Sequence, residues 1–100
     1  MKVCVTAQGK DLNAQVDPRF GRCQYFIFVD TDNPENFEAV ENPYKDAPGG
    51  AGVQSAQFVA NKGVKKVYTG NVGPGARQVL ESAGIEVVTV SGTVKEVIGA

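Results

Sequence analysis

The chain has 100 residues, with ten basic and eleven acidic side chains, two cysteines and no histidine or tryptophan. Its net charge of −1 argues against a general nucleic-acid binder, which needs clustered Lys and Arg to neutralise phosphates. The absence of histidine excludes Ser-His and Cys-His catalysis and removes the commonest metal ligand.

Size and cysteine usage indicate a small cytoplasmic domain. The longest apolar run, residues 25–29, is far shorter than the ~20 residues of a membrane helix. The chain starts directly in a strand pattern, so we expect no signal peptide. The two cysteines, Cys4 and Cys23, form neither a disulfide framework nor a CxxC site, which fits a reducing compartment. We therefore expect a single domain over residues 1–100 that neither crosses a membrane nor binds nucleic acid.

The first half of the chain predicts three strands. Residues 1–7 alternate between β-branched and other side chains with period two, and residues 25–29 are continuously apolar, as in a central strand covered on both faces. A polar connection with Gly and Pro, residues 8–23, separates them. Residues 30–35 have turn chemistry, and the alternation in residues 37–42 predicts the second strand of a hairpin, at the edge of the sheet.

The second half predicts helices that alternate with strands. A Gly- and Pro-rich loop, residues 43–52, leads into it, and residues 70–75 form a second Gly-rich turn. Apolar side chains at helical spacing and terminating glycines predict helices at residues 53–61 and 76–83, and the runs after them predict strands at residues 64–69 and 85–90. Thr93 and Glu96 resemble a capping box for a last short helix. The order is βββαβαβα, an α/β protein with a mixed five-stranded sheet covered by helices.

This topology brings three loops to one edge of the sheet. If the first, fourth and fifth strands are parallel, the loop 8–23 and the turns 49–52 and 70–75 all lie at their carboxyl ends, where open α/β sheets bind ligands. Two of these loops open helices, whose free N–H groups suit anions. Arg19 and Arg22 add charge with forked donors. The sequence thus predicts a pocket for a polyanion; ordinary turn and capping geometry is the alternative for each glycine turn alone.

Other chemistries receive less support. Residues 73–78 and 50–55 both lack the third glycine of a GxGxxG motif, so a phosphate or nucleotide ligand stays an alternative. Cys4 is expected in the core. Cys23 follows Arg22 at the ligand edge, where cations would favour the thiolate that binds iron or attacks electrophiles, and half-buried packing is the alternative for this residue. The carboxylates that a ribonuclease H-like nuclease would need have no spacing that fixes a metal pair, and we expect them at the surface: Asp11, Asp17, Glu41 and Asp46.

Three motifs in order resemble the dinitrogenase iron-molybdenum cofactor biosynthesis family, and they cover nearly the whole chain. They are residues 16–26 (VDPRFGRCQYF), residues 41–43 (ENP) followed by 49–56 (GGAGVQSA), and residues 67–76 (VYTGNVGPGA) followed by 80–85 (LESAGI). The resemblance implies a three-layer α/β/α domain with a ribonuclease H-like motif. It also implies a nitrogenase accessory factor-like, small stand-alone protein that is not an enzyme.

The resemblance further implies cargo and site residues. The cargo is an anionic iron–sulfur or iron–molybdenum-type cluster, bound transiently, with a cluster-donor or cluster-acceptor protein as partner. Some relatives use a histidine near the Phe-Gly-Arg loop; this chain has Arg19 there, which leaves Cys23 as the candidate iron ligand. We expect the cofactor-binding residues to be Arg19, Gly21, Arg22, Gly49, Gly50, Gly52, Asn71, Gly73 and Gly75. The alternative is a phosphate-, nucleotide- or partner-binding module without metal, and a nuclease comes third.

Overall fold

Five strands and three helices make up the computed structural model, which describes residues 1–99. The strands are β1 (Lys2–Ala7), β2 (Tyr25–Asp30), β3 (Asn33–Glu41), β4 (Lys66–Thr69) and β5 (Glu86–Thr89), and the helices are α1 (Ala51–Ala60), α2 (Pro74–Ser82) and α3 (Val94–Ile98). The predicted order βββαβαβα is confirmed. No helix in the described part of the chain is long and apolar enough to cross a membrane.

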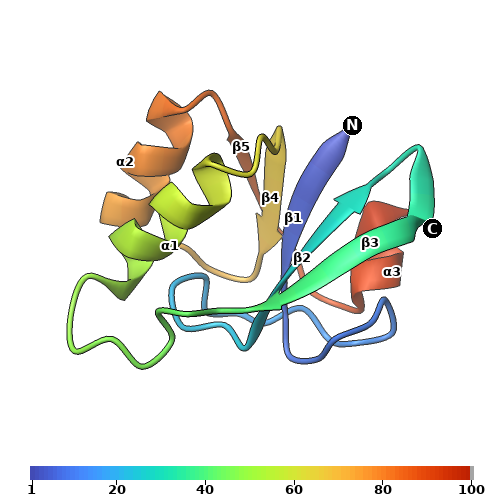
Figure 1. The fold of residues 1–100 in the computed structure, drawn as a ribbon, viewed down its shortest axis with the longest axis horizontal. Coiled ribbons are helices and arrows are strands. Elements are labelled where there is room, and N and C mark those ends of the chain that lie inside the picture. The colour runs from blue at the N-terminus through green and yellow to red at the C-terminus, as the bar shows by residue number, and fades with distance from the viewer. Residues whose placement is uncertain (100) are drawn as a thin grey trace.

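The strands form one mixed sheet in the order β3-β2-β1-β4-β5. β1 and β3 both pair antiparallel with β2, whereas β1, β4 and β5 run parallel to one another. Because of these directions, the loops that follow β1, β3, β4 and β5 all leave the sheet at the same edge, at the bottom of Figure 1. The predicted hairpin of the second and third strands and the parallel arrangement of β1, β4 and β5 are therefore confirmed.

Two apolar cores, one on each face of the sheet, make the fold a three-layer α/β/α structure. On one face, Phe26 and Phe28 pack in a buried cluster with Leu80 of α2 and Val59 of α1. On the other face, a second cluster joins alternate strand residues to Val94 of α3. Figure 1 shows α1 and α2 together on one side of the sheet and α3 on the other. Because successive side chains of a strand point to opposite faces, the strands contribute apolar residues to both cores.

The hairpin differs from its prediction. β3 begins at Asn33, so the connection is the two-residue turn Thr31–Asp32 rather than residues 30–35. A register irregularity between Val29 and Asp30 admits this tight turn. Pro34 lies inside β3, which is possible because β3 is an edge strand and one side of its backbone needs no partner.

Candidate functional site

The three loops predicted to converge do make contact. A Cβ atom on Gly21 would lie 2.7 Å from both the Cα and the N of Gly52, and a Cβ on Gly70 would lie 2.5 Å from the Cα of Pro18. The N–H of Phe20 donates to the carbonyl of Asn71 at 3.1 Å. The segment 17–23 therefore packs against the start of α1 and the turn after β4, and glycine is required where backbone meets backbone.

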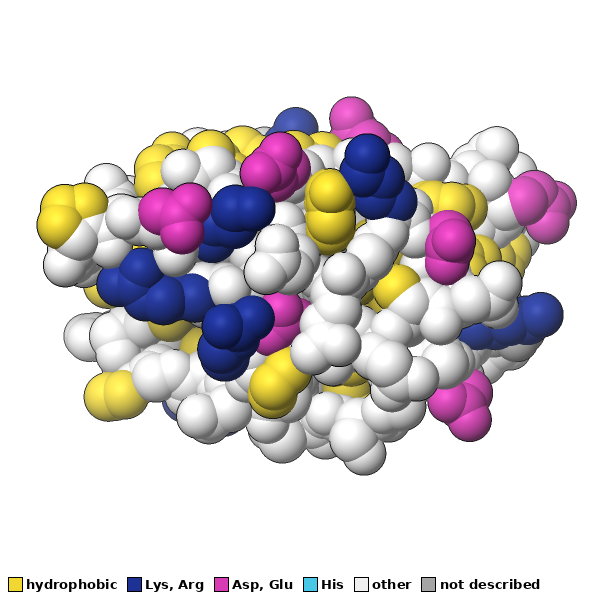
Figure 2. Space-filling model, turned by 90° about the horizontal axis from the view of Figure 1, so that it is seen from below, with side chains coloured by type: hydrophobic (Ala, Val, Ile, Leu, Met, Phe, Trp, Pro, Cys, Tyr) yellow, Lys and Arg dark blue, Asp and Glu magenta, His cyan; other side chains and the backbone are white. Residues whose placement is uncertain are grey.

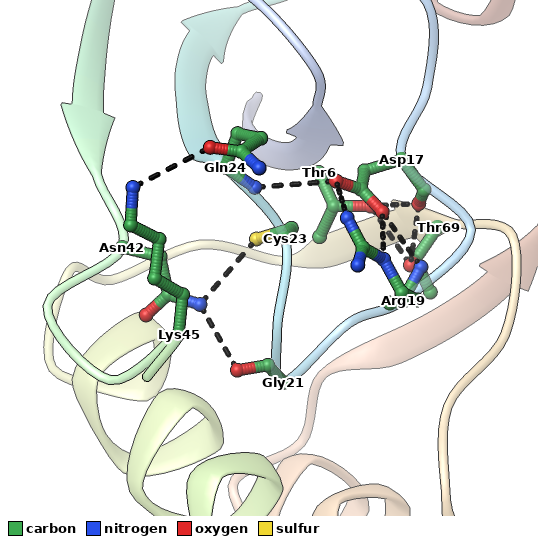
Figure 3. Close-up of polar contacts among 9 residues, drawn as sticks. All are labelled: Thr6, Asp17, Arg19, Gly21, Cys23, Gln24, Asn42, Lys45 and Thr69. Atoms are coloured by element: carbon green, nitrogen blue, oxygen red, sulfur yellow. Dashed lines mark hydrogen bonds and ion pairs between the residues drawn. The ribbon is translucent and has the colours of Figure 1, made fainter. Parts of the chain in front are cut away.

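Asp17 anchors this loop from inside the protein. Its carboxylate is fully buried and accepts hydrogen bonds from the backbone N–H of Arg19 (3.0 Å) and of Gln24 (3.2 Å). It also accepts from the guanidinium of Arg19, at 3.2 Å from Nε and 3.3 Å from Nη2 (Figure 3). The prediction that Asp17 lies at the surface is wrong, because four N–H donors compensate its burial.

Two threonines fasten the backbone of Asp17 to the sheet. Thr6 Oγ1 donates to the carbonyl of Asp17 at 2.8 Å, and the N–H of Asp17 donates to the carbonyl of Thr6 at 2.8 Å. Thr6 Oγ1 and Thr69 Oγ1 are 2.8 Å apart, which links the ends of β1 and β4. These polar residues on otherwise apolar strands were not singled out in the sequence. Their position at strand ends beside the loop was the available signal.

Asn42 joins the loop after β3 to the loop before β2. Its Nδ2 donates to the carbonyl of Gly21 at 3.0 Å and lies 3.7 Å from the Sγ of Cys23 (Figure 3). Its Oδ1 accepts from the N–H of Tyr44 at 2.9 Å and from Ser55 Oγ at 3.5 Å. Asn42 is buried and all its polar atoms are used. The motif ENP contained this residue, but its role as a clamp was not predicted.

A polar hollow of about 540 Å³ opens beside these loops. Its lining consists of Arg19, Arg22, Gln24, Lys45 and Asp46. Arg22 Nη1 donates to the carbonyl of Lys45 at 2.9 Å, and Lys45 Nζ lies 3.4 Å from Gln24 Oε1. Figure 2 shows Lys and Arg side chains gathered on this face, with carboxylates among them. The structure therefore brings the two predicted arginines together and adds Lys45, a third cation that the sequence analysis missed.

Lys45 is held at the hollow by Glu41. The ammonium Nζ lies 2.9 Å from Glu41 Oε2. This hydrogen bond lowers the pKa of Glu41 and raises the pKa of Lys45, so both groups stay charged around neutral pH.

The predicted glycines and Asn71 are not among the residues that line the hollow. α1 begins after Gly50 and α2 after Gly73, and neither helix has a side-chain hydrogen bond at its N-terminus. Gly50 adopts a left-handed conformation with φ +73°, which explains the glycine there. Asn71 is exposed and contacts the loop through its backbone carbonyl. The cofactor-binding roles predicted for Asn71 and for the glycines stay predictions; these glycines are Gly21, Gly49, Gly50, Gly52, Gly73 and Gly75.

Cys23 lies in the apolar core and does not line the hollow. Its side chain is fully buried, and burial, together with the nearby Asp17 carboxylate, raises the pKa of its thiol well above the ordinary range. The expectation that adjacent cations favour the thiolate is wrong for this conformation, because burial outweighs the small effect of Arg19. Cys4 is buried in the same cluster, as predicted. A bond from Cys23 to iron stays a prediction.

The carboxylates do not assemble into a cation site. Asp11, Glu41 and Asp46 are exposed, as expected, and Asp17 is buried in its own network. Residues 1–99 contain no group of three or more His, Cys, Asp or Glu side chains that could hold a metal ion. The arrangement at this edge instead collects cationic and N–H donors, which suit an anion.

Comparisons with known proteins agree with the fold and with the motifs. The structure of the apo form of the orange protein from Desulfovibrio gigas is similar with a TM-score of 0.92 and 40% identity, covering 98% of this chain and 83% of that one. TM1290 from Thermotoga, which belongs to the DUF35 family, has a TM-score of 0.82 and 41% identity over 99% of this chain and 84% of its own. The uncharacterized protein MJ0580 of Methanocaldococcus jannaschii is 37% identical over 83 residues, which are 81% of this chain and 70% of that protein. The model of the family described as dinitrogenase iron-molybdenum cofactor matches residues 1–100, and the chain belongs to this family.

Proposed function

We propose that this protein is a non-enzymatic carrier that binds an anionic iron–sulfur or iron–molybdenum-type cluster in the hollow beside the converged loops. The observation that carries the proposal is the meeting of Arg19, Arg22 and Lys45 around one polar hollow. Guanidinium groups hold anions with charge-assisted, directional hydrogen bonds. Membership of the iron-molybdenum cofactor family supplies the class of cargo.

The donor set supports binding by charge rather than by thiolate bonds. The residues that line the hollow offer nitrogen and oxygen atoms, while Cys23 is buried under the loop. The cluster would therefore arrive and leave as a complete anion with its own sulfide or thiolate ligands. This mode suits transient carriage between a donor and an acceptor protein. One similar structure is that of the apo form of the orange protein, that is, of a form without its bound group.

A metal-free oxyanion, such as a phosphate group, is the second candidate ligand. It is favoured by the same observation that weakens thiolate ligation: the described lining of the hollow contains no sulfur atom. Inorganic phosphate therefore serves as a competitor in the test of the cluster proposal.

The test is anaerobic titration of the protein with a preformed four-iron, four-sulfide cluster that carries thiolate ligands. We expect the wild type to retain cluster absorption after gel filtration. The double variant Arg19→Gln/Arg22→Gln should bind at least about tenfold more weakly, since two charge-assisted contacts are lost. The matched control Arg77→Gln/Lys95→Gln removes the same charge elsewhere and should bind normally.

The outcomes separate the alternatives. No retention by the wild type contradicts the carrier proposal. Normal binding by the arginine variant together with loss in Cys23→Ala would replace charge by thiolate ligation. Full displacement of the cluster by inorganic phosphate at a comparable concentration would favour the oxyanion candidate.

A further inference from the structure

Arg19 is held by Asp17 through two parallel hydrogen bonds. Nε of Arg19 lies 3.2 Å from Oδ1 of Asp17, and Nη2 lies 3.3 Å from Oδ2, so one whole edge of the guanidinium faces the carboxylate. Such forked pairs fix the plane of the guanidinium as well as its distance. The geometry of Arg19 is therefore set by the orientation of Asp17.

Asp17 itself has no freedom to turn. Its side chain is 0% exposed, and its two oxygens also accept the backbone N–H groups of Arg19 and Gln24. Its backbone is tied to Thr6 on β1. A rigid buried acceptor thus holds a guanidinium whose side chain is 58% exposed.

The other edge of the Arg19 guanidinium is free for a ligand. Within residues 1–99 Nη1 has no acceptor, and Nη2 uses only one of its two N–H groups, while Arg19 lines the hollow. The neighbouring cations differ from Arg19. Nη1 of Arg22 already donates to the carbonyl of Lys45, and the Lys45 ammonium is a point charge that pairs with Glu41. Among the three, Arg19 alone presents a flat edge of paired donors in a fixed plane.

We propose that Asp17 is a positioning residue that presents the Nη1–Nη2 edge of Arg19 to an anion with two adjacent acceptor atoms. This inference rests on the proposed anion site and adds the recognition geometry: a ligand that shows two neighbouring oxygen or sulfur acceptors at its rim. Phosphate and the sulfide or thiolate rim of a metal cluster both belong to this class. Asp17 acts through Arg19 and does not touch the ligand.

The sign of one substitution separates positioning from simple charge. Asp17 carries a negative charge close to the hollow, so its removal alone would strengthen anion binding. If Asp17 positions Arg19, its removal instead weakens binding, because the guanidinium loses its fixed plane. The two effects have opposite directions, and the positioning effect is the one we expect to prevail.

The test compares Asp17→Asn, Arg19→Lys and the double variant, with the thiolate-ligated four-iron cluster and with inorganic phosphate as separate probes. Asp17→Asn and Arg19→Lys should each lower affinity about tenfold, although Arg19→Lys keeps the charge. The affinity of the double variant should be within about twofold of that of the weaker single variant, since both substitutions disrupt the same Asp17–Arg19 pair. The Nε–H resonance of Arg19 in ¹H–¹⁵N spectra should be protected from exchange in the wild type and lost in Asp17→Asn.

Each outcome decides the matter. Equal or tighter binding by a folded Asp17→Asn, or full affinity in Arg19→Lys, overturns the positioning role while leaving the carrier proposal standing. Binding of neither probe by the wild type overturns both. If Asp17→Asn fails to fold, Arg19→Lys, which leaves Asp17 in place, carries the test by its affinity and its melting temperature.

Discussion

Polar side chains at the two ends of the sheet differ in burial. At the carboxyl end of β1 and β4 lie all five buried polar side chains of the described residues: Thr6, Asp17, Asn42, Ser55 and Thr69. At the other end, side-chain ion pairs are exposed or partly exposed, such as Lys66 with Glu86 at 3.6 Å and the Met1 amino group with Asp30 at 3.2 Å. One end is fixed by buried hydrogen bonds, and the other is covered by screened charges.

This difference shows where the fold specifies geometry. A buried hydrogen-bonded group is expensive to leave without a partner, at about 1–3 kcal/mol, so a satisfied network resists rearrangement. Exposed ion pairs contribute about 0–1 kcal/mol and tolerate substitution. The network therefore holds in place the loop that carries Arg19 and Arg22, which a ligand site requires.

The largest predicted effect comes from the glycine contact that closes the carboxyl end. Gly21→Ala would place a Cβ 2.7 Å from backbone atoms of Gly52, which have no flexible end to move aside. We expect the free energy of unfolding, measured by urea denaturation, to fall by roughly 3 kcal/mol or more.

The matched control for this prediction is Gly49→Ala. A Cβ there has open space and the backbone needs no positive φ, so stability should stay the same or rise by up to about 1 kcal/mol. Equal stability of Gly21→Ala and wild type would show that the loop and α1 separate easily.

The next effect tests the buried clamp against the exposed pairs. Asn42→Ala removes the donor to the carbonyl of Gly21 and the acceptor of the Tyr44 N–H. We expect a loss of about 2–3 kcal/mol in the free energy of unfolding. Glu86→Gln breaks the exposed pair with Lys66 at the opposite end and should change stability by less than about 0.5 kcal/mol. Similar losses in both variants would contradict the contrast between the two ends.

The sequence predicted the fold well because hydrophobic periodicity is a local signal. The strand and helix order, the parallel extension and the meeting of three loops all followed from it and from connection rules. The start of β3 was missed because Asn33 and Pro34 have turn chemistry, and only pairing with β2 makes them strand. Arg19 and Arg22 were predicted for the site because cations between turn residues signal anion binding.

Burial of polar groups was the part that the sequence did not reveal. Aspartate is a residue type usually found at the surface. The burial of Asp17 is possible only because four N–H groups, from Arg19 and Gln24, donate to its carboxylate. Cys23 was interpreted from its neighbour Arg22, whereas its pKa depends on the segments that cover it. Lys45 reaches the hollow through the course of the loop 42–50. The cover over Cys23 and the reach of Lys45 depend on distant parts of the chain, so no local pattern contains them. Three of the four donors to Asp17, by contrast, come from Arg19, two residues later.

The smallest predicted effect concerns the pH dependence of stability. It tests whether the loops at the carboxyl end keep Cys23 shielded from solvent. Burial raises the pKa of the Cys23 thiol in the folded protein, whereas an unfolded cysteine ionises near pH 8.5. The folded state then keeps a proton that the unfolded state loses, so stability is full below about pH 8.5 and falls as pH rises above it. Each such thiol contributes a decrease of about 1.4 kcal/mol per pH unit.

The free energy of unfolding of Cys23→Ala should therefore fall less steeply with pH than that of the wild type between about pH 9 and 10. The two slopes, measured by urea denaturation at each pH, should differ by close to that amount per thiol. Cys4→Ala is the comparison, because burial also raises the pKa of that thiol in the middle of β1. A reduced slope in both variants would show that both thiols stay protonated in the folded state. If only Cys4→Ala reduces the slope, Cys23 ionises in the folded protein, and the loops over it open often enough to let a thiolate reach a cluster.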